Sequence, residues 1–283
     1  MTVPEHPGLD PAERALLTGS LRHAMSGRTG HALDTALAEL GWPEILTAAP
    51  ELTGPVLFRL LGETGAHAPL VLDVLAHAGA DTAVLPFAGG RWVRWARHDP
   101  HSIAPHGDSV DDELPLYRAA PGVPPAAHPL AEGRRVLGWW LLGTGHAMLT
   151  LARTHALDRA QFGRPLAAFQ AVRHRLAETL VALDGAEAAL TVADEAALDP
   201  TRAEHRAPAA LLAKAAAGQA ARTAARHCQQ VLGGIGFTAE HALHRHVRRS
   251  LVLDGLLGSA RELTREAGAA IRLSGTATRL ADL

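Results

Sequence analysis

The sequence predicts a mainly α-helical protein with a small β insert near its middle. Three observations lead to this class. Apolar residues recur at helical spacing through the first 80 residues, strand-like alternation is confined to residues 81–129, and long Ala- and Leu-rich segments with short connections fill residues 130–283. We therefore expect N-terminal helices over 1–80, a reduced β-domain over 81–129, and a C-terminal antiparallel four-helix bundle over 130–283.

The N-terminal part predicts several short helices. Asp10 is placed to cap a helix whose first residue is Pro11, a combination that is typical of helix N-termini. The next periodic segment stops at Gly41, and two more, over 54–65 and 68–80, also end near glycine.

The middle part predicts a hairpin followed by irregular chain. Residues 81–87 and 91–96 alternate as strands do, and Gly89-Gly90 between them can turn the chain. From there to residue 129 the chain is rich in Pro, His and Asp, which is typical of loops with short extended pieces.

Four long segments make up the predicted bundle. They run from about 130 to 157, 165 to 197, 203 to 232, and 239 to 272. We expect Pro165 in the first turn of the second helix, and a break near Gly255 and Gly258 in the fourth.

Composition argues against several classes of protein. A formal net charge of -2 gives no electrostatic reason to expect nucleic acid or an anionic membrane as a partner. The single cysteine, Cys228, excludes an internal disulfide framework and is interpreted as a small core residue. The most apolar run, residues 136–152, is shorter than the roughly 20 residues that span a bilayer, and the N-terminus lacks a signal-peptide pattern. We expect a cytoplasmic protein.

A glycine-rich turn, QVLGGIGFTAE over residues 230–240, raises the question of a ligand. Gly233, Gly234 and Gly236 follow a predicted helix, and a helix stop accounts for one or two of them. Three glycines in four residues would also let a ligand approach the backbone closely. No strand precedes the turn and no G-x-G-x-x-G is present, so a Rossmann dinucleotide site is excluded.

A second polar stretch points to the same kind of ligand. Arg159, Gln161 and Phe162 are expected in a short loop between two bundle helices. The guanidinium fork suits a diphosphate, the glutamine amide can donate to the same oxygens, and an exposed aromatic ring suits adenine or ribose.

Together the two stretches resemble the acyl-CoA dehydrogenase family, from Arg134 to about Ala267. The motifs are R-x-Q-F-G-x-P-x-x-x-F-Q, then Q-V-L-G-G-x-G-F-T-x-E, then R-x-x-R. In that family the bundle forms the dimer contact, and these motifs reach across it to the ADP half of a partner's FAD. The resemblance therefore implies FAD as cofactor and these contacts to it: Arg159, Gln161, Phe162, Gln170, Gln230, Gly233 and Gly234.

The resemblance also implies that this chain has no catalytic base. The family usually places a glutamate shortly after an Arg-Asp pair, but here the pair reads Arg248-Arg249 and the glutamate position holds Leu257. Some members carry the base beside an arginine that matches Arg134, where this chain has Gly133. Neither Leu257 nor Gly133 can accept the α-proton of an acyl thioester. Nearby carboxylates, Asp254 and Glu132, are expected to point elsewhere on their helices.

The family's signatures for the flavin ring are absent as well. Neither Thr-Glu-Pro…Gly-Ser-Asp nor Trp-x-Ser/Thr occurs, and the predicted β-domain has about half the expected size. A metal centre is not expected either, because His241, His244 and His246 have no carboxylate at ligand spacing.

We therefore predict the short, supporting subunit of a heteromeric acyl-CoA dehydrogenase, of the type known from bacterial breakdown of steroid side chains. It would share FAD with a catalytic partner chain in an α2β2 assembly that carries out α,β-dehydrogenation of an acyl-CoA. Two alternatives stay open. One is a flavin-free assembly homologue, and the other is a homo-oligomeric enzyme that uses Asp254 or Glu240 as an unrecognised base.

Overall fold

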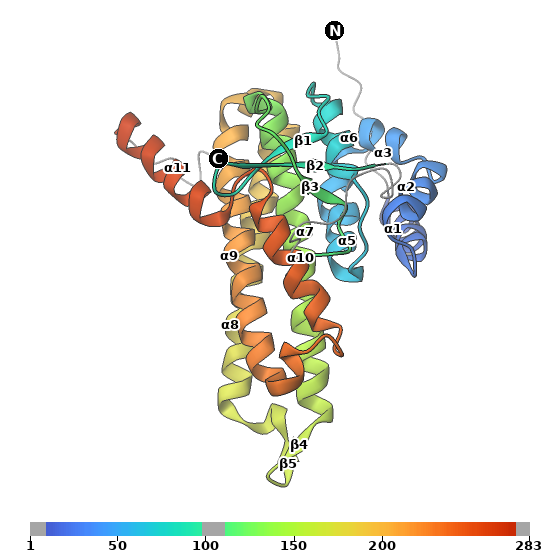
Figure 1. The fold of residues 1–283 in the computed structure, drawn as a ribbon, viewed down its shortest axis with the longest axis vertical. Coiled ribbons are helices and arrows are strands. Elements are labelled where there is room, and N and C mark those ends of the chain that lie inside the picture. Colours follow the sequence, from blue (N-terminus) through green and yellow to red (C-terminus); the bar gives the residue numbers. More distant parts are fainter. Residues whose placement is uncertain (1–9, 98–110, 276–283) are drawn as a thin grey trace.

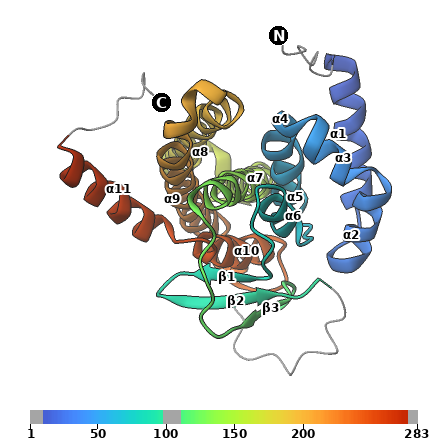
Figure 2. The ribbon, with the colours of Figure 1, turned by 90° about the horizontal axis from the view of Figure 1, so that it is seen from above.

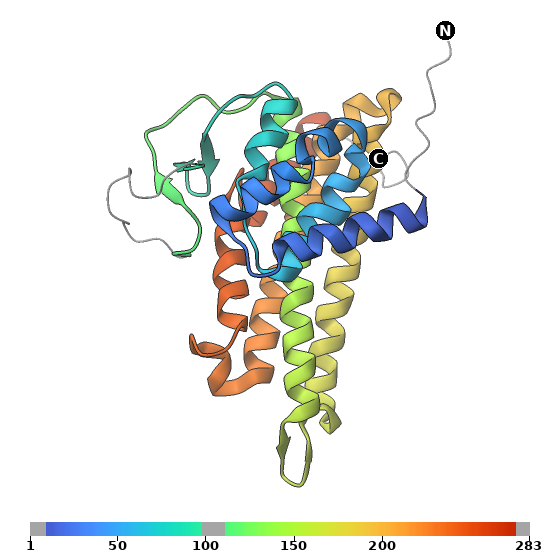
Figure 3. The ribbon, with the colours of Figure 1, turned by 90° about the vertical axis from the view of Figure 1, so that its right-hand side faces the viewer.

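The computed structural model describes residues 10–97 and 111–275. These residues form the predicted mainly α-helical fold: short N-terminal helices, a three-stranded sheet, and a long helical bundle against which both pack (Figures 1 and 3). The fold class predicted from the sequence is confirmed.

The first N-terminal helix begins as predicted, whereas the short helices over 42–48 and 50–52 were not predicted. The Asp10 carboxylate accepts from the backbone N–H groups of Ala12 and Glu13, and the Glu13 side chain accepts from the Asp10 N–H, which completes a capping box. Gly41, at φ +80°, separates the second helix from the third. The elements are α1 (Pro11–Met25), α2 (Gly30–Glu39), α3 (Trp42–Ala48), α4 (Pro50–Leu52), the π-helix η1 (Thr53–Phe58), α5 (Arg59–Thr64) and α6 (Leu70–His77).

The predicted hairpin is confirmed, and one further strand joins it. β1 (Val84–Phe87) and β2 (Arg91–Trp95) pair antiparallel, and β3 (Leu116–Arg118) pairs with the other edge of β2. Gly89 and Gly90 in the turn both have positive φ, a conformation that glycine adopts without steric cost. The bundle covers the open edge of β1, because the Ala88 N–H donates to the Gly255 carbonyl at 2.8 Å.

Helices α7, α8, α9 and α10 form the bundle, and seen from above α7 lies between α8 and α9 on one side and α5 and α6 on the other (Figure 2). After a break at the predicted place, α11 leaves the bundle and projects away from it (Figures 1 and 2). The elements are α7 (Ala127–Asp158), α8 (Gln170–Leu198), α9 (Arg206–Leu232), α10 (Leu243–Gly255) and α11 (Ala260–Ser274).

The predicted start of the second bundle helix was wrong. Pro165 lies in a short hairpin, in which β4 (Ala160–Gln161) pairs with β5 (Arg164–Pro165). A 3-10 turn, η3 (Leu166–Ala168), follows, and α8 starts only at Gln170. The reason is local: the two-residue hairpin turn requires extended chain on both sides, and a proline φ fits a strand as well as a first helical turn.

Two other helices also begin a few residues later than predicted. A 3-10 segment, η4 (Pro200–His205), precedes α9, and the Asp199 carboxylate accepts from the Thr201 N–H at its start. Another, η5 (Gly233–Phe237), precedes α10.

One continuous core joins the three predicted parts of the chain. Trp140 of α7 stacks on Trp95 of β2, with ring centroids 6.1 Å apart, and meets Phe58 of η1 edge-on at 5.9 Å. Trp139 is buried too, and its Nε1 donates to Asp194 of α8 at 2.9 Å. The adjacent tryptophans therefore both belong to the core.

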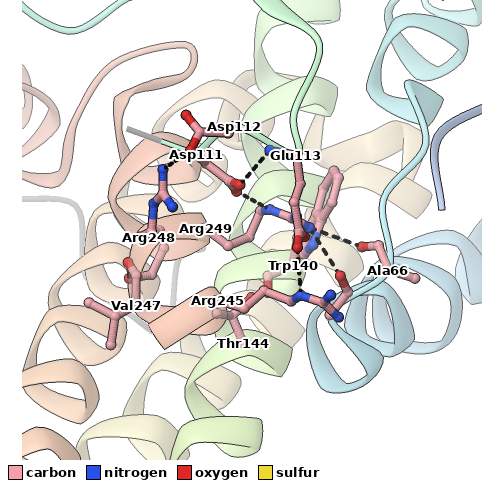
Figure 4. Close-up of polar contacts among 12 residues, drawn as sticks. Ala66, Asp111, Asp112, Glu113, Trp140, Thr144, Arg245, Val247, Arg248 and Arg249 are labelled. Carbon is pink, nitrogen blue, oxygen red and sulfur yellow. Dashed lines mark hydrogen bonds and ion pairs between the residues drawn. The ribbon is translucent and has the colours of Figure 1, made fainter. Parts of the chain in front are cut away.

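A buried arginine fastens the three parts together by polar contacts (Figure 4). Arg249 of α10 is 1% exposed. Its Nε donates to the Asp111 carboxylate at 2.5 Å, and its Nη2 to Glu113 at 3.0 Å. Its Nη1 donates to the carbonyls of Gly65 and Ala66, in the turn after α5. Bundle, insert and N-terminal helices thus meet at one guanidinium.

Two buried histidines stay neutral beside this cation. Burial and then the charge of Arg249 lower the pKa of His67 to about 3 and that of His246 to about 4. Protonation of either ring would place a second positive charge next to Arg249, which the low-dielectric surroundings disfavour.

Arg249→Met should lower the free energy of unfolding by about 3–5 kcal/mol, because Asp111 would keep a buried charge without its partner. The matched control is Arg248→Met, one residue earlier, whose ion pair with the exposed Asp112 is worth about 0–1 kcal/mol. Denaturant unfolding followed by circular dichroism measures both. Similar losses in the two variants would contradict the role given to Arg249.

Candidate functional site

The β4–β5 hairpin places Arg159, Gln161 and Phe162 at the end of the bundle farther from the β1–β3 sheet (Figure 1). We call this the free end of the bundle. The turn residues of the hairpin, Phe162 and Gly163, have φ of +54° and +77°. Such a conformation suits glycine but strains phenylalanine, and Phe162 is nevertheless 91% exposed. Its ring meets that of Phe169 edge-on, with centroids 6.3 Å apart, and the remaining surface of the ring is open to a ligand or a partner chain.

The polar side chains at this end form few hydrogen bonds with the rest of the described chain. The Arg159 guanidinium forms no hydrogen bond or ion pair with any residue in the described ranges, and its side chain is exposed. The Gln161 amide donates only locally, to the Ala160 carbonyl at 2.8 Å. Gln170 begins α8, and its Nε2 lies 3.4 Å from Nε2 of His174. These donors remain available to an anionic ligand.

The glycine turn ends α9 as predicted, but the fold does not require all of its glycines. Gly233 has φ +64° and terminates the helix, with its N–H donating to the carbonyls of Gln229 and Gln230. A Cβ on Gly236 would lie 2.9 Å from the Gln229 carbonyl oxygen, so close packing excludes a side chain there. Gly234 has no positive φ, and a Cβ on it would meet no neighbouring atom within 4 Å. Nothing within the described chain accounts for glycine at 234.

The hairpin and the glycine turn lie at the same end of the bundle, and a pair of histidines links them. His155, in the last turn of α7, meets His241, which follows the glycine turn, with ring centroids 6.4 Å apart and the rings at 85°. Burial, then His241 and Arg159, lower the pKa of His155. Sequence reasoning missed His155, although its position four residues before Arg159 puts both on one side of the chain.

The two expected positions for a catalytic base face each other, although 124 residues separate them. A Cβ on Gly133 of α7 would lie 2.6 Å from Cδ1 of Leu257 and 3.0 Å from Cδ2 of Leu75. Leu257 is 1% exposed, and its φ of +55° is the second positive φ of a non-glycine residue among the described residues, after that of Phe162. An apolar side chain therefore fills the place at which the base was expected.

Nearby carboxylates are committed elsewhere. Asp254 accepts from the Ala260 N–H at 2.9 Å, and Glu132 accepts from Arg135 at 2.7 Å. Glu240 lies before α10 and Leu257 after it, so the whole helix separates them. Asp254 and Glu132 are thus engaged in hydrogen bonds of the fold, and Glu240 lies at the far end of α10.

The loop that carries Leu257 is held by a buried lysine that the sequence analysis did not single out. Lys214 of α9, the only lysine of the chain, is fully buried, and its Nζ donates to the carbonyls of Asp254 at 3.0 Å and Gly258 at 2.6 Å. Arg134 donates to the Leu257 carbonyl at 3.1 Å. Burial lowers the pKa of Lys214 to about 7. A lone lysine in an Ala-rich helix was the only available signal.

Other chemistry finds little support in the described residues. Within 10–97 and 111–275, no group of three or more His, Cys, Asp or Glu side chains could hold a metal ion. Cys228 is buried, and burial raises the pKa of its thiol to about 12, which fits the predicted core role. No helix in those ranges is long and apolar enough to cross a membrane.

Comparison with known proteins points to one family. Residues 121–270 match the acyl-CoA dehydrogenase C-terminal domain. The chain is 31% identical to the acyl-CoA dehydrogenase IpdE2 of Mycobacterium tuberculosis, over 82% of this chain and 70% of that protein. It is 32% identical to the acyl-CoA dehydrogenase FadE34 of the same organism, over 66% of this chain but 27% of that protein.

Solved structures agree on the fold. A variant of the Tcur3481-Tcur3483 steroid ACAD superposes with a TM-score of 0.72 at 20% identity, over 94% of this chain and 99% of that one. A glutaryl-coenzyme A dehydrogenase complex superposes with a TM-score of 0.63 at 15% identity, over 98% of each chain.

The buried lysine gives a pH dependence that can be measured. The ordinary pKa of lysine is 10.5 and that of Lys214 in the fold is about 7, so between these values the unfolded chain holds a proton that the folded chain has released. The free energy of unfolding should therefore rise with pH above 7, by up to about 1.4 kcal/mol per unit, and Lys214→Met should remove this contribution.

Denaturant unfolding of both proteins between pH 7 and 8.5 tests the slope. Because the chain has one lysine, ¹³C-lysine labelling gives one Cε signal, whose titration reports the pKa directly. A midpoint near 10.5 would contradict the prediction.

Proposed function

Because this chain belongs to the acyl-CoA dehydrogenase family, we propose that it is the supporting subunit of an FAD-dependent acyl-CoA dehydrogenase built from two unlike chains. The observation that carries the proposal is the contrast between the two ends of the bundle. One end offers uncommitted donors and open backbone, and the other has a leucine where the base was expected.

The free end fits the diphosphate of FAD. Arg159 can present two parallel N–H groups to phosphate oxygens, and Gln161 and Gln230 can add neutral donors. No packing contact or positive φ within the described chain requires glycine at position 234. A ligand that approaches the backbone at this position would require it. Phe162 would supply an aromatic surface, and Gln170 and Gly233 would complete the contacts. FAD, when bound, accepts the hydride from the acyl β-carbon.

The chain fits the flavin ring and the acyl group poorly. The sheet has three short strands among the described residues, and the space between Gly133 and Leu257 is closed by packed apolar side chains. A leucine side chain cannot remove the α-proton of an acyl-CoA. The ring site and the base would therefore come from a partner chain, and the substrate would reach this subunit only through that partner.

The substrate class follows from similarity and from the proposed assembly. Acyl-CoA is the substrate named for the family, and the name of one structural neighbour specifies a steroid enzyme and joins two chain names. We propose a steroid-derived acyl-CoA, an α2β2 arrangement, and a cytoplasmic location. The chain would divide into parts 1–80, 81–129 and 130–283, with the flavin contacts in the last.

The flavin-free alternative and the homo-oligomeric alternative are less well supported. Assembly alone would not require an uncommitted Arg159, a strained Phe162 or a side-chain-free Gly234. A self-sufficient enzyme would require Asp254 or Glu240 to reach the substrate. Asp254 instead accepts from the Ala260 N–H at the start of α11, and Glu240 lies at the other end of α10.

The chain purified alone should bind little FAD and show no acyl-CoA dehydrogenase activity, because it lacks the ring site and the base. The chain captured from its native host should carry flavin together with a second acyl-CoA dehydrogenase chain. Absorbance spectra, mass spectrometry and activity assays distinguish the two preparations. A yellow, active homo-oligomer would overturn the proposal, and Leu257→Glu should not give activity to the isolated chain because positioning is also missing.

Arg159→Ala should weaken flavin retention in the captured complex by about 1.5–3 kcal/mol, the usual value of hydrogen bonds to charged groups. Arg159→Lys should restore only part of it, since an ammonium cannot make the bidentate contact. Gly234→Val should be at least as harmful, because a side chain would block the approach to the backbone. The readout is the flavin-to-protein ratio after gel filtration, with Arg14→Ala on α1 as control. A full flavin complement in a folded Arg159→Ala complex would refute the cofactor role.

A further inference from the structure

The contact between His155 and His241 places two titratable rings between the segments that carry the proposed flavin contacts. His155 lies in the last turn of α7, directly before the hairpin. His241 lies between the glycine turn and α10. The rings meet edge-on with centroids 6.4 Å apart, so a proton on each ring would set two positive charges against each other.

His241 also holds the start of α10. Its Nδ1 accepts a hydrogen bond from the Leu243 N–H at 3.1 Å. This N–H is among the first of the helix, which find no acceptor within the helix itself. An imidazole nitrogen accepts only through its lone pair, so Nδ1 of His241 carries no proton in this arrangement. Protonation there would remove the acceptor and place a positive charge at the positive end of the helix dipole.

The surroundings of His155 disfavour its protonated form. Burial and then the charges of His241 and Arg159 lower the pKa of His155, while Asp158 acts in the other direction. The 3-10 turn η3, which packs against α7, contains no titratable side chain. The other elements around the pair carry these charged or titratable side chains: Arg164 of β5, His174 of α8, Arg226 and His227 of α9, Glu240 before α10, and His244 and Arg245 of α10.

Several of these neighbours already have partners of their own. The Arg164 guanidinium lies over the Phe169 ring, 4.1 Å from its centroid. Nδ1 of His227 lies 3.1 Å from the Thr179 hydroxyl, and Arg245 pairs with Glu113.

The histidine pair joins the two halves of the proposed flavin site. Arg159 and Gln161 follow His155 in the chain, and Gln230 and Gly234 precede His241. Donors from two segments act on one diphosphate only when both segments are held in the productive geometry. A contact that fixes the glycine turn against the end of α7 therefore bears directly on how firmly the ligand is held.

We propose that His155 and His241 are positioning residues for the flavin contacts, and that protonation of the pair separates the glycine turn from the hairpin. The inference rests on the proposed function, because it concerns how the chain holds its share of FAD. The folded arrangement favours the neutral rings, so the flavin contacts should be firm above the ordinary histidine pKa of 6.5 and weaken as the pH falls below it.

The test measures the dissociation constant of FAD in the complex with the partner chain captured from the native host, at pH 7.5 and pH 5.5. In the wild-type complex it should rise at least about fivefold on acidification, and in His155→Phe/His241→Asn less than about twofold. Phenylalanine keeps an aromatic edge without a titratable nitrogen, and the asparagine carbonyl can accept from a backbone N–H two residues on. His241→Ala, which offers no acceptor, should weaken binding already at pH 7.5, and His241→Asn should restore part of the loss.

A matched control comes from the other end of the bundle. His77, in the last turn of α6, and His128, in the first turn of α7, are exposed. The double variant His77→Phe/His128→Asn makes the same chemical changes away from the flavin contacts. It should keep the wild-type ratio between the two pH values, and circular dichroism confirms that each variant is folded at both.

A second measurement tests the coupling of the rings without flavin. In the full chain labelled with ¹³C-histidine, the signal of His155 is the one that disappears in His155→Phe. Its titration midpoint should move up toward 6.5 in His241→Asn, because a positive charge no longer forms opposite it. An unchanged midpoint would show that the two rings titrate independently, and the inference of a pair would be wrong.

The outcomes separate this inference from the proposed function. If the complex carries flavin but His155→Phe/His241→Asn keeps the wild-type ratio, the inference fails and the proposed function stands. An equal dissociation constant at both pH values in the wild-type complex has the same meaning. If no flavin-bearing complex of two unlike chains is captured, the proposed function fails, and the inference fails with it.

Discussion

The position of the insert and of the N-terminal helices against the bundle depends on one buried guanidinium, that of Arg249. Its five N–H donors fit a site lined by two carboxylates and two backbone carbonyls, which come from segments far apart in the chain. A buried charge is costly unless its hydrogen bonds are complete, so the three segments must come together before α10 can bury this side chain. The interaction therefore selects one arrangement of the parts as well as stabilising it. The Asp111 carboxylate that pairs with Arg249 lies 138 residues earlier in the chain.

Once that arrangement is fixed, the ends of the bundle acquire opposite properties. At the sheet end, Leu257, Gly133 and Leu75 close a space that is apolar and fully packed. Lys214 and Arg134 donate hydrogen bonds to backbone carbonyls of the loop that carries Leu257, which ties this loop to α9 and α7. At the free end, the hairpin and the glycine turn keep donors and a bare stretch of backbone exposed.

Backbone strain occurs at both ends of the bundle. Phe162 and Leu257 are the non-glycine residues with positive φ among the described residues, and each stands at a position that the family resemblance singles out. The two cases differ in what offsets the strain. Leu257 recovers it through burial and through hydrogen bonds of its N–H to Pro86 and of its carbonyl to Arg134. Phe162 meets Phe169 edge-on but stays 91% exposed, which is why its function is sought in contacts with a ligand or partner.

The sequence by itself determined the fold class, the Asp10 cap, the β1–β2 hairpin, the break after Gly255 and the family, because these depend on local periodicity, on turn chemistry and on motifs of fixed spacing. It misplaced Pro165, because a proline fits a strand and a first helical turn equally well and a two-residue turn upstream decides between them. Only the tertiary structure showed that Gly133 and Leu257 face each other and that Lys214 holds the loop that carries Leu257. It also showed that no contact within the described chain requires glycine at 234. Each of these facts concerns the distance between atoms that are remote in the chain, and such distances are set by packing around the core and by the Arg249 contacts rather than by the residues on either side.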